Sequence, residues 1–208
     1  MDYKNYKESR DIAWELLIKY NVRSLPVKIS EICRGEGIRI RSFGQSRELL
    51  RALGFEKSTQ ENDGFAVILE GRGYIFYNEA CTPQRQRFTV AHELGHFVSG
   101  DVGEIPTLRN KEPEECDNDI EHKANVVAAR LLAPACVLWG LGVHYAREIS
   151  ELCDISAQAA EWRARRMETL YRREEEFSKT KGKSCFLLSP SERRVYEQFL
   201  PFIEQLKL

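Results

Sequence analysis

The chain has 208 residues, 30% of them charged, and its 31 basic and 32 acidic side chains leave a formal net charge of −1. A chain of this length can bury a substantial core in one compact domain. The near-neutral balance excludes a general attraction to polyanions, so nucleic acid is not the expected partner.

The six cysteines are scattered and form no CxxC pair, which excludes a small disulfide scaffold and a structural zinc knuckle. The N-terminal residues are polar and amphipathic and do not have the pattern of a signal peptide. No window approaches the roughly 18 consecutive apolar residues that a membrane-spanning helix requires. We therefore expect a soluble, cytoplasmic protein with reduced thiols.

Two helices are predicted at the start of the chain, over about residues 2–20 and 27–34. The first has apolar residues at helical spacing, and the second is ended by Gly35 and Gly37.

A small sheet is predicted next, because β-branched and aromatic residues gather in three short runs. The predicted strands are residues 38–43, 65–69 and 74–78. Gly71 and Gly73 supply the turn between the last two, so the economical arrangement is a three-stranded, mostly antiparallel sheet. Residues 44–63 are ambiguous, with a half-buried turn of helix as one interpretation.

The second half of the chain is predicted to be helical. Thr82 and Pro83 suit the N-cap and first turn of a helix that runs to about Ser99 and ends at Gly100. Residues 101–118 have no apolar period and should form a surface loop. Further helices are predicted over residues 119–132, 135–153 and 156–177, with a short last helix capped by Ser189 or Ser191.

The helix that ends at Gly100 carries the motif HELGH. His92 and His96 are four residues apart and so lie on one face, where two imidazoles can bind one metal ion. Glu93 is rotated by about 100° from His92 and can take a proton from water at the metal. These residue types indicate zinc-dependent hydrolysis of an amide. The alternative is a chance match on an ordinary amphipathic helix.

A catalytic zinc usually has three protein ligands, so a third ligand must lie downstream. On the next predicted helix Glu121 can supply a carboxylate oxygen, and Asn125, one turn later, can hydrogen-bond the outer nitrogen of a ligating histidine. Two alternatives stay open: Glu121 as a capping-box residue behind Asn118, and His122 as a rival ligand. His144 is a weaker candidate, as a donor to the oxyanion of the transition state.

The runs YIFYNEACTPQRQRFTVAHELGHFVSG and EHKANVVAARLLAP resemble the ImmA/IrrE family of intracellular metallopeptidases over about residues 74–134. The resemblance implies zinc ligands His92, His96 and Glu121, a general base Glu93, and a supporting Asn125. Manganese is a possible substitute, since a set of two histidines and one glutamate tolerates both metals. Many members have another histidine shortly after the zinc helix, where this chain reads FVSGD.

We expect an α+β fold, with a small three-stranded, mostly antiparallel sheet packed against a zincin-like helical core. We expect a metallopeptidase domain over residues 1–135, a helical extension resembling a helix-turn-helix over 136–180, and a tail with a short helix over 181–208. The implied activity is cleavage of a helix-turn-helix repressor, which derepresses genes of a phage, mobile element or stress response.

The alternative function is a non-proteolytic antirepressor or toxin–antitoxin component that binds a partner protein, with zinc holding the fold together. DNA binding through the helix-turn-helix-like pattern is a third possibility. The neutral charge argues against it and favours a packing role for those helices.

Overall fold

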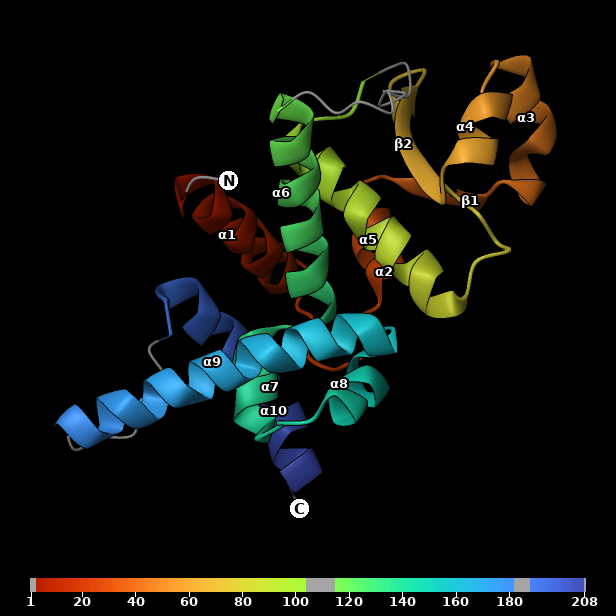
Figure 1. The fold of residues 1–208 in the computed structure, drawn as a ribbon. Helices are drawn as coiled ribbons and strands as arrows, with labels where there is room; N and C mark the ends of the chain where they lie inside the picture. The colour runs from red at the N-terminus through yellow and green to blue at the C-terminus, as the bar shows by residue number, and fades with distance from the viewer. Residues whose placement is uncertain (1–2, 104–114, 182–187, 208) are drawn as a thin grey trace. The chain divides into compact units, whose positions relative to one another are not determined.

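The structure, a computed structural model, describes residues 3–103, 115–181 and 188–207 (Figure 1). Within them the chain forms two compact units. The first comprises Met1–Ala13 and Lys28–Ala129, and the second comprises Trp14–Val27 and Arg130–Leu208. Two helices, α1 (Tyr3–Lys19) and α6 (Glu115–Leu132), each run from one unit into the other.

The first unit contains all three strands, so the expected α+β fold is confirmed. The strands are β1 (Arg39–Ser42), β2 (Gly64–Leu69) and β3 (Arg72–Tyr77). β3 lies in the middle, pairing antiparallel with β2 and parallel with β1. The sheet is therefore mixed, with one of its two pairings parallel. Alternation along a strand sets which side chains share a face, but it does not determine the direction of the neighbouring strand.

The two faces of this sheet have different covers. On one face a small core forms from Leu50, Phe65, Val67 and Phe76. The covering segment is η1 (Gly44–Ser46), α3 (Arg47–Ala52) and α4 (Glu56–Glu61), which Figure 1 shows beside the sheet. The ambiguous residues 44–63 thus form three short helices, in which Leu50 is buried while Leu49 and Leu53 are exposed.

The other face of the sheet packs against helix α5 (Pro83–Ser99), and glycines permit the close approach. A Cβ atom added to Gly64 would lie 2.4 Å from the Thr89 side chain, and one added to Gly73 would lie 3.0 Å from Phe97. A larger residue at either position would push the helix away from the strands. The sheet therefore serves as the support on which α5 is held, with α2 (Ile29–Gly35) as a further neighbour.

Local chemistry sets both ends of α5, as expected from the sequence. The Thr82 hydroxyl accepts a hydrogen bond from the Arg85 amide, and Pro83 occupies the first turn. At the other end Gly100 adopts a left-handed conformation with φ 78°, and the amides of Gly100 and Asp101 donate to the His96 carbonyl.

The start of α6 differs from the expectation. The helix begins at Glu115, four residues before the predicted start at Asp119, so Asn118 lies inside it and is not its N-cap. The interpretation of Glu121 as a capping-box residue behind Asn118 is therefore wrong. The remainder of the expected loop, residues 104–114, lies outside the described residues.

The second unit is helical in its described part. Its helices are α7 (Ala135–Leu141), α8 (Ala146–Cys153), α9 (Ala157–Lys181) and α10 (Pro190–Lys207). The single helix predicted over residues 135–153 is wrong, because Gly142 takes a left-handed φ of 69° and separates α7 from α8. The last helix is longer than expected, and the Ser189 hydroxyl caps it by accepting from the Glu192 amide.

The segment Trp14–Val27 belongs to the second unit through α10. The side-chain amide of Gln198 donates to the carbonyls of Leu17, at 2.9 Å, and Val22, at 2.6 Å. Each unit thus consists of two separate segments of the chain, whereas each domain expected from the sequence was one continuous segment. The expected boundaries after residues 135 and 180 stay a prediction.

One stretch of the described chain, Asp119–Leu141, is long and apolar enough by composition to cross a membrane. However, 72% of its most apolar window is buried inside the protein. That burial is typical of a helix in a protein core.

Candidate metal centre

Helices α5 and α6 supply the side chains of the candidate site, and Gly95 brings these helices together. A Cβ atom added to Gly95 would lie 3.0 Å from the Ala124 Cα and 3.1 Å from its carbonyl oxygen. Since those are main-chain atoms, the two backbones are in near contact here. Gly95 directly precedes His96, and Ala124 directly precedes Asn125, so the contact lies at the level of the site.

Three potential metal ligands meet at this crossing. The Nε2 atom of His92 lies 3.1 Å from a carboxylate oxygen of Glu121, and Nε2 of His96 lies 3.5 Å from the other oxygen. The two Nε2 atoms are 3.1 Å apart. Among the described residues, this is the one group of His, Cys, Asp and Glu side chains whose ligand atoms all lie within 4.8 Å of one another.

The spacing of these atoms suits a small divalent ion. Zinc–nitrogen bonds of about 2.0–2.1 Å at tetrahedral angles put neighbouring ligand atoms about 3.3 Å apart. The distances of 3.1, 3.1 and 3.5 Å lie around that value. The donor set of two imidazoles and one carboxylate is one that zinc accepts in catalytic sites. The residues present therefore fit a metal ion.

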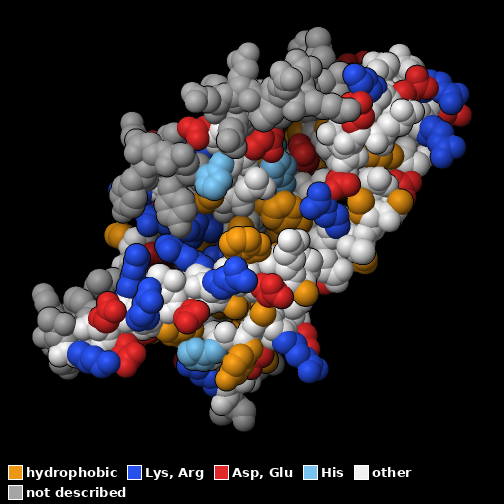
Figure 2. All heavy atoms as spheres, viewed as in Figure 1, with side chains coloured by type: hydrophobic (Ala, Val, Ile, Leu, Met, Phe, Trp, Pro, Cys, Tyr) orange, Lys and Arg blue, Asp and Glu red, His pale blue; other side chains and the backbone are white. Residues whose placement is uncertain are grey.

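Asn125 holds the outer nitrogen of His92. Its Oδ1 atom lies 3.0 Å from Nδ1 of His92. A carbonyl oxygen can only accept, so Nδ1 of His92 carries the hydrogen and Nε2 keeps its lone pair for a metal. Figure 2 shows histidine and acidic side chains next to one another over the region of α5 and α6.

Asp101 is a residue that the sequence analysis did not single out. Its Oδ2 atom lies 3.8 Å from Nδ1 of His96, and the His96 side chain is only 5% exposed. The signal was present in the run FVSGD, where a carboxylate follows the glycine that ends α5. It was overlooked because no periodic pattern continues beyond Gly100.

Three further residues were predicted as possible site residues: Glu93, His122 and His144. Glu93 is half-buried on α5, beside His92. His122 is exposed and is not part of the His92–His96–Glu121 group. His144 belongs to the second unit, where its ring stacks on Tyr171 with the centroids 4.2 Å apart. That stacking gives His144 a packing role in its own unit.

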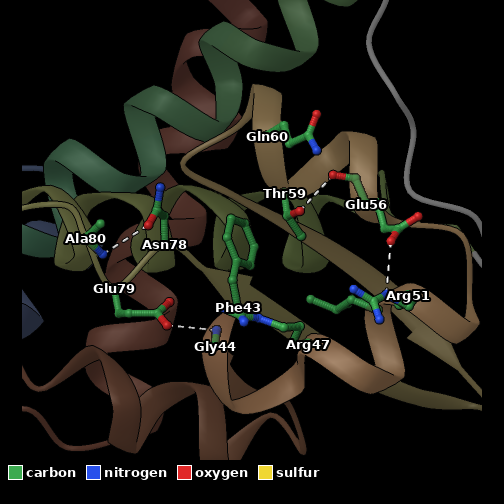
Figure 3. Close-up of a pocket in the computed structure, with 11 residues that line it drawn as sticks. Phe43, Gly44, Arg47, Arg51, Glu56, Thr59, Gln60, Asn78, Glu79 and Ala80 are labelled. Atoms are coloured by element: carbon green, nitrogen blue, oxygen red, sulfur yellow. Dashed lines mark hydrogen bonds and ion pairs between the residues drawn. The ribbon is translucent and has the colours of Figure 1, made fainter.

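A separate pocket of about 520 Å³ lies in the first unit, beyond the ends of β1 and β3 (Figure 3). Phe43, Arg51 and Glu79 are among its lining residues. Several of its polar groups are already bonded: the Glu79 carboxylate accepts from the Gly44 amide at 2.8 Å, and Arg51 pairs with Glu56 at 3.2 Å. It shares no residue with the His92–His96–Glu121 group, so it is not part of the metal centre.

Comparison with known families settles the relationship of the chain to other proteins. The sequence model of a peptidase family, described as the IrrE N-terminal-like domain, matches residues 33–165. This span covers more than half of the chain and includes every residue of the candidate centre. The chain belongs to this family.

Two characterised members of the IrrE family are similar to the chain in part. A radiation response metalloprotease IrrE from Deinococcus radiodurans is 34% identical over 94 residues, which are 41% of this chain and 29% of that protein. The protein of the same name from Deinococcus deserti is 36% identical over 94 residues, which are 41% of this chain and 34% of the relative. The chain thus spans about a third of the length of these IrrE relatives.

Proposed function

We propose that the protein is a zinc-dependent endopeptidase. The observation that carries the proposal is the convergence of Nε2 of His92, Nε2 of His96 and the Glu121 carboxylate within 4.8 Å, with Glu93 next to His92 on the same helix. Membership of a peptidase family and similarity to two proteins named metalloproteases support it. Manganese is the alternative metal, because the same donor set accepts it.

In this proposal each side chain has a distinct task. His92, His96 and Glu121 hold the ion. A zinc ion there supplies a Lewis acid for an amide carbonyl and makes water a better nucleophile near neutral pH. Glu93 is the general base, which takes the proton of the attacking water and delivers it to the leaving amine. Asn125 fixes the ring of His92, so that Nε2 stays directed at the centre.

We propose a helix-turn-helix transcriptional repressor as the substrate, cleaved in the cytoplasm to derepress genes of a phage, mobile element or stress response. The support is the resemblance to the ImmA/IrrE family, together with the radiation response named for both relatives. A near-neutral chain with a net charge of −1 also suits a protein substrate better than a polyanion.

We expect the substrate repressor to be encoded next to the protein. The test incubates zinc-loaded protein with a helix-turn-helix repressor from such a neighbouring gene and follows fragments by gel and mass spectrometry. We expect the wild type to cleave the repressor. Glu93→Gln should keep its zinc but cleave about 10²–10⁴-fold more slowly, since general-base catalysis typically contributes that much. Glu168→Gln, at an exposed glutamate of α9, is the matched control and should cleave like the wild type.

The results separate the proposal from its alternative. A repressor that binds the zinc-loaded protein but stays intact would indicate a non-proteolytic antirepressor, in which zinc is structural. Equal cleavage by Glu93→Gln and wild type would remove Glu93 from the mechanism. Mass spectrometry under native conditions identifies the bound metal, and cleavage by zinc-loaded and by manganese-loaded protein shows which metal supports the activity.

A further inference from the structure

We infer that Asp101 is a positioning residue for the metal centre, which holds the ring of His96 as Asn125 holds the ring of His92. The inference rests on the proposed function, because it assigns Asp101 a role toward the metal ligands. It concerns a residue outside both helices that supply the ligands.

The first observation is a carboxylate oxygen buried beside a ligand. Oδ2 of Asp101 is inaccessible to solvent and has no hydrogen-bond partner within the described residues. A buried polar atom without a partner is unfavourable, so such atoms generally mark a missing partner or a function. Nδ1 of His96 faces it at 3.8 Å.

The second observation is that the backbone fixes the position of Asp101. After the left-handed turn at Gly100, the Asp101 amide donates to the His96 carbonyl at 3.0 Å. Two residues later the Gly103 carbonyl accepts from the Ile68 amide of β2, also at 3.0 Å. Asp101 is therefore held between the end of α5 and the edge of the sheet. Its main chain is bonded to the same residue whose ring its side chain faces.

The third observation is that the two histidine rings have the same orientation relative to the centre. Both Nε2 atoms point at the centre, where they are 3.1 Å apart, and both Nδ1 atoms face an oxygen outside it. A carboxylate accepts hydrogen bonds only, so it favours the ring form in which Nδ1 of His96 carries the hydrogen. That form leaves Nε2 as a lone-pair donor, and carboxylate–histidine–metal arrangements work in this way.

The gap of 3.8 Å is longer than a hydrogen bond, which for N–H···O spans about 2.7–3.2 Å. A small rotation of the carboxylate or of the ring that brings Oδ2 and Nδ1 closer by about 0.6–1.1 Å would form a hydrogen bond. Contacts of this kind are often long in free proteins and shorten when the site is in use. No main-chain rearrangement is needed, because the backbone of Asp101 is already bonded in place.

A purely structural role for the Asp101 side chain can be told apart from positioning. The bonds that end α5 use the main-chain atoms of Gly100 and Asp101, so they survive truncation of the side chain. Asp101→Ala should therefore leave the helix end intact and change the metal centre. Asp101→Asn keeps the shape and one accepting oxygen, and should fall between Asp101→Ala and the wild type.

The experiment measures the zinc Kd of the full chain by competition with a chromogenic chelator. We expect Asp101→Ala to raise the Kd by about 10–100-fold, the usual effect of removing such a support, and Asp101→Asn to raise it less. Asp63→Asn is the matched control: Asp63 is a half-buried carboxylate paired with Arg85 at the opposite end of α5, and its loss should leave the Kd unchanged.

A second measurement reads the ring itself. Long-range ¹H–¹⁵N correlation spectra of ¹⁵N-labelled protein show which nitrogen of His96 carries the hydrogen. The wild type and Asp63→Asn should show it on Nδ1, whereas Asp101→Ala should show a mixture of the two ring forms. The melting temperature of metal-free Asp101→Asn should match that of the wild type.

Failure of the inference and failure of the proposed function give different results. A wild type that binds zinc, with a Kd for Asp101→Ala within twofold of it, would overturn the role of Asp101 and leave the peptidase proposal standing. A wild type that binds neither zinc nor manganese would overturn both. A Kd that rises equally in Asp63→Asn would also reject the inference, since the effect would then be general to carboxylates around α5.

Discussion

Nδ1 of His92 lies 3.0 Å from the side-chain oxygen of Asn125, and this contact joins α5 to α6 directly behind the candidate metal centre. The two helix backbones meet at Gly95 and Ala124. Asn125 directly follows Ala124, and His92 lies about one helical turn before Gly95. The geometry of the centre therefore depends on the packing of two helices as well as on the ligands themselves.

Replacement of Asn125 with alanine should weaken metal binding. The variant removes the acceptor that keeps the hydrogen of His92 on Nδ1, so we expect the zinc Kd to rise by about 10–100-fold in chelator competition. Asn62→Ala is a suitable control, because Asn62 also bonds through its side chain, to the Ser58 carbonyl, at the end of α4. An unchanged Kd in Asn125→Ala would mean that packing alone orients His92.

Gly95→Ala should destabilise the protein although alanine is the better helix former. The gain of about 1 kcal/mol in helix propensity is outweighed by about 1–3 kcal/mol for forcing a methyl group against α6, where Ala124 is 3.0–3.4 Å away. We expect a net loss of up to about 2 kcal/mol in the free energy of unfolding, measured by urea denaturation.

The companion variant Ala124→Gly should not rescue Gly95→Ala. The two shortest contacts are to the Cα and carbonyl oxygen of Ala124, which glycine retains. A Gly95→Ala protein that is more stable than the wild type, or one restored by Ala124→Gly, would contradict this account of the helix crossing.

The thiols of Cys33 and Cys136 should resist alkylation in the folded protein. Burial raises the pKa of each to about 12, so almost none of either thiol is the reactive thiolate at pH 8. Iodoacetamide labelling followed by peptide mass spectrometry should modify both only after denaturant is added. Cys81 is half-buried and serves as the accessible reference, which should be labelled before Cys33 and Cys136. Rapid labelling of Cys136 under native conditions would contradict its buried position.

The Asp63–Arg85 pair should contribute to stability at neutral pH and lose its contribution in acid. Burial raises the pKa of Asp63, but hydrogen bonds from Arg85 and Cys81 outweigh it, so the pKa lies below the usual 3.8. A group with a lowered pKa in the folded state stabilises fully above its unfolded pKa, and the effect disappears as the pH falls through the folded value.

Thermal unfolding of wild type and Asp63→Asn across a pH series tests this. The wild type should melt at a higher temperature at pH 7, and the two curves should converge as the pH falls below 3.8 and through the lowered pKa of Asp63 in the folded protein. Because the Asp63 side chain is 36% exposed, solvent screening keeps the difference small. A difference that grows on acidification would have the wrong sign.

Features set by local chemistry were predictable from the sequence. The cap at Thr82 and the left-handed Gly100 follow from preferences of single residues, and the structure has both. The spacing of His92 and His96 required only helix geometry. Glu121 was inferred as a neighbour from a second helical pattern, and the structure brings its carboxylate beside both histidines. The roles of these residues in binding metal and in catalysis stay predictions.

Features set by long-range contact were not predictable in the same way. The parallel pairing of β1 with β3 depends on the path of the chain between strands, which the alternation of side chains does not encode. Asp101 lies where periodic pattern ends, so its proximity to the His96 ring emerges only in three dimensions. The break at Gly142 had a visible signal in the glycine itself, but the apolar residues on either side suggested one continuous helix.

The order of the sheet leaves β1 at its edge, with Arg39 and Arg41 exposed and alternating with Ile40 and Ser42. An outer strand with free backbone groups is a template on which another polypeptide can add as a further strand. Here an incoming strand would pair beside the guanidinium groups of Arg39 and Arg41. A second copy of β1 would add two more positive charges, which repel the first two. These like charges disfavour strand addition at this edge of the sheet on which α5 packs.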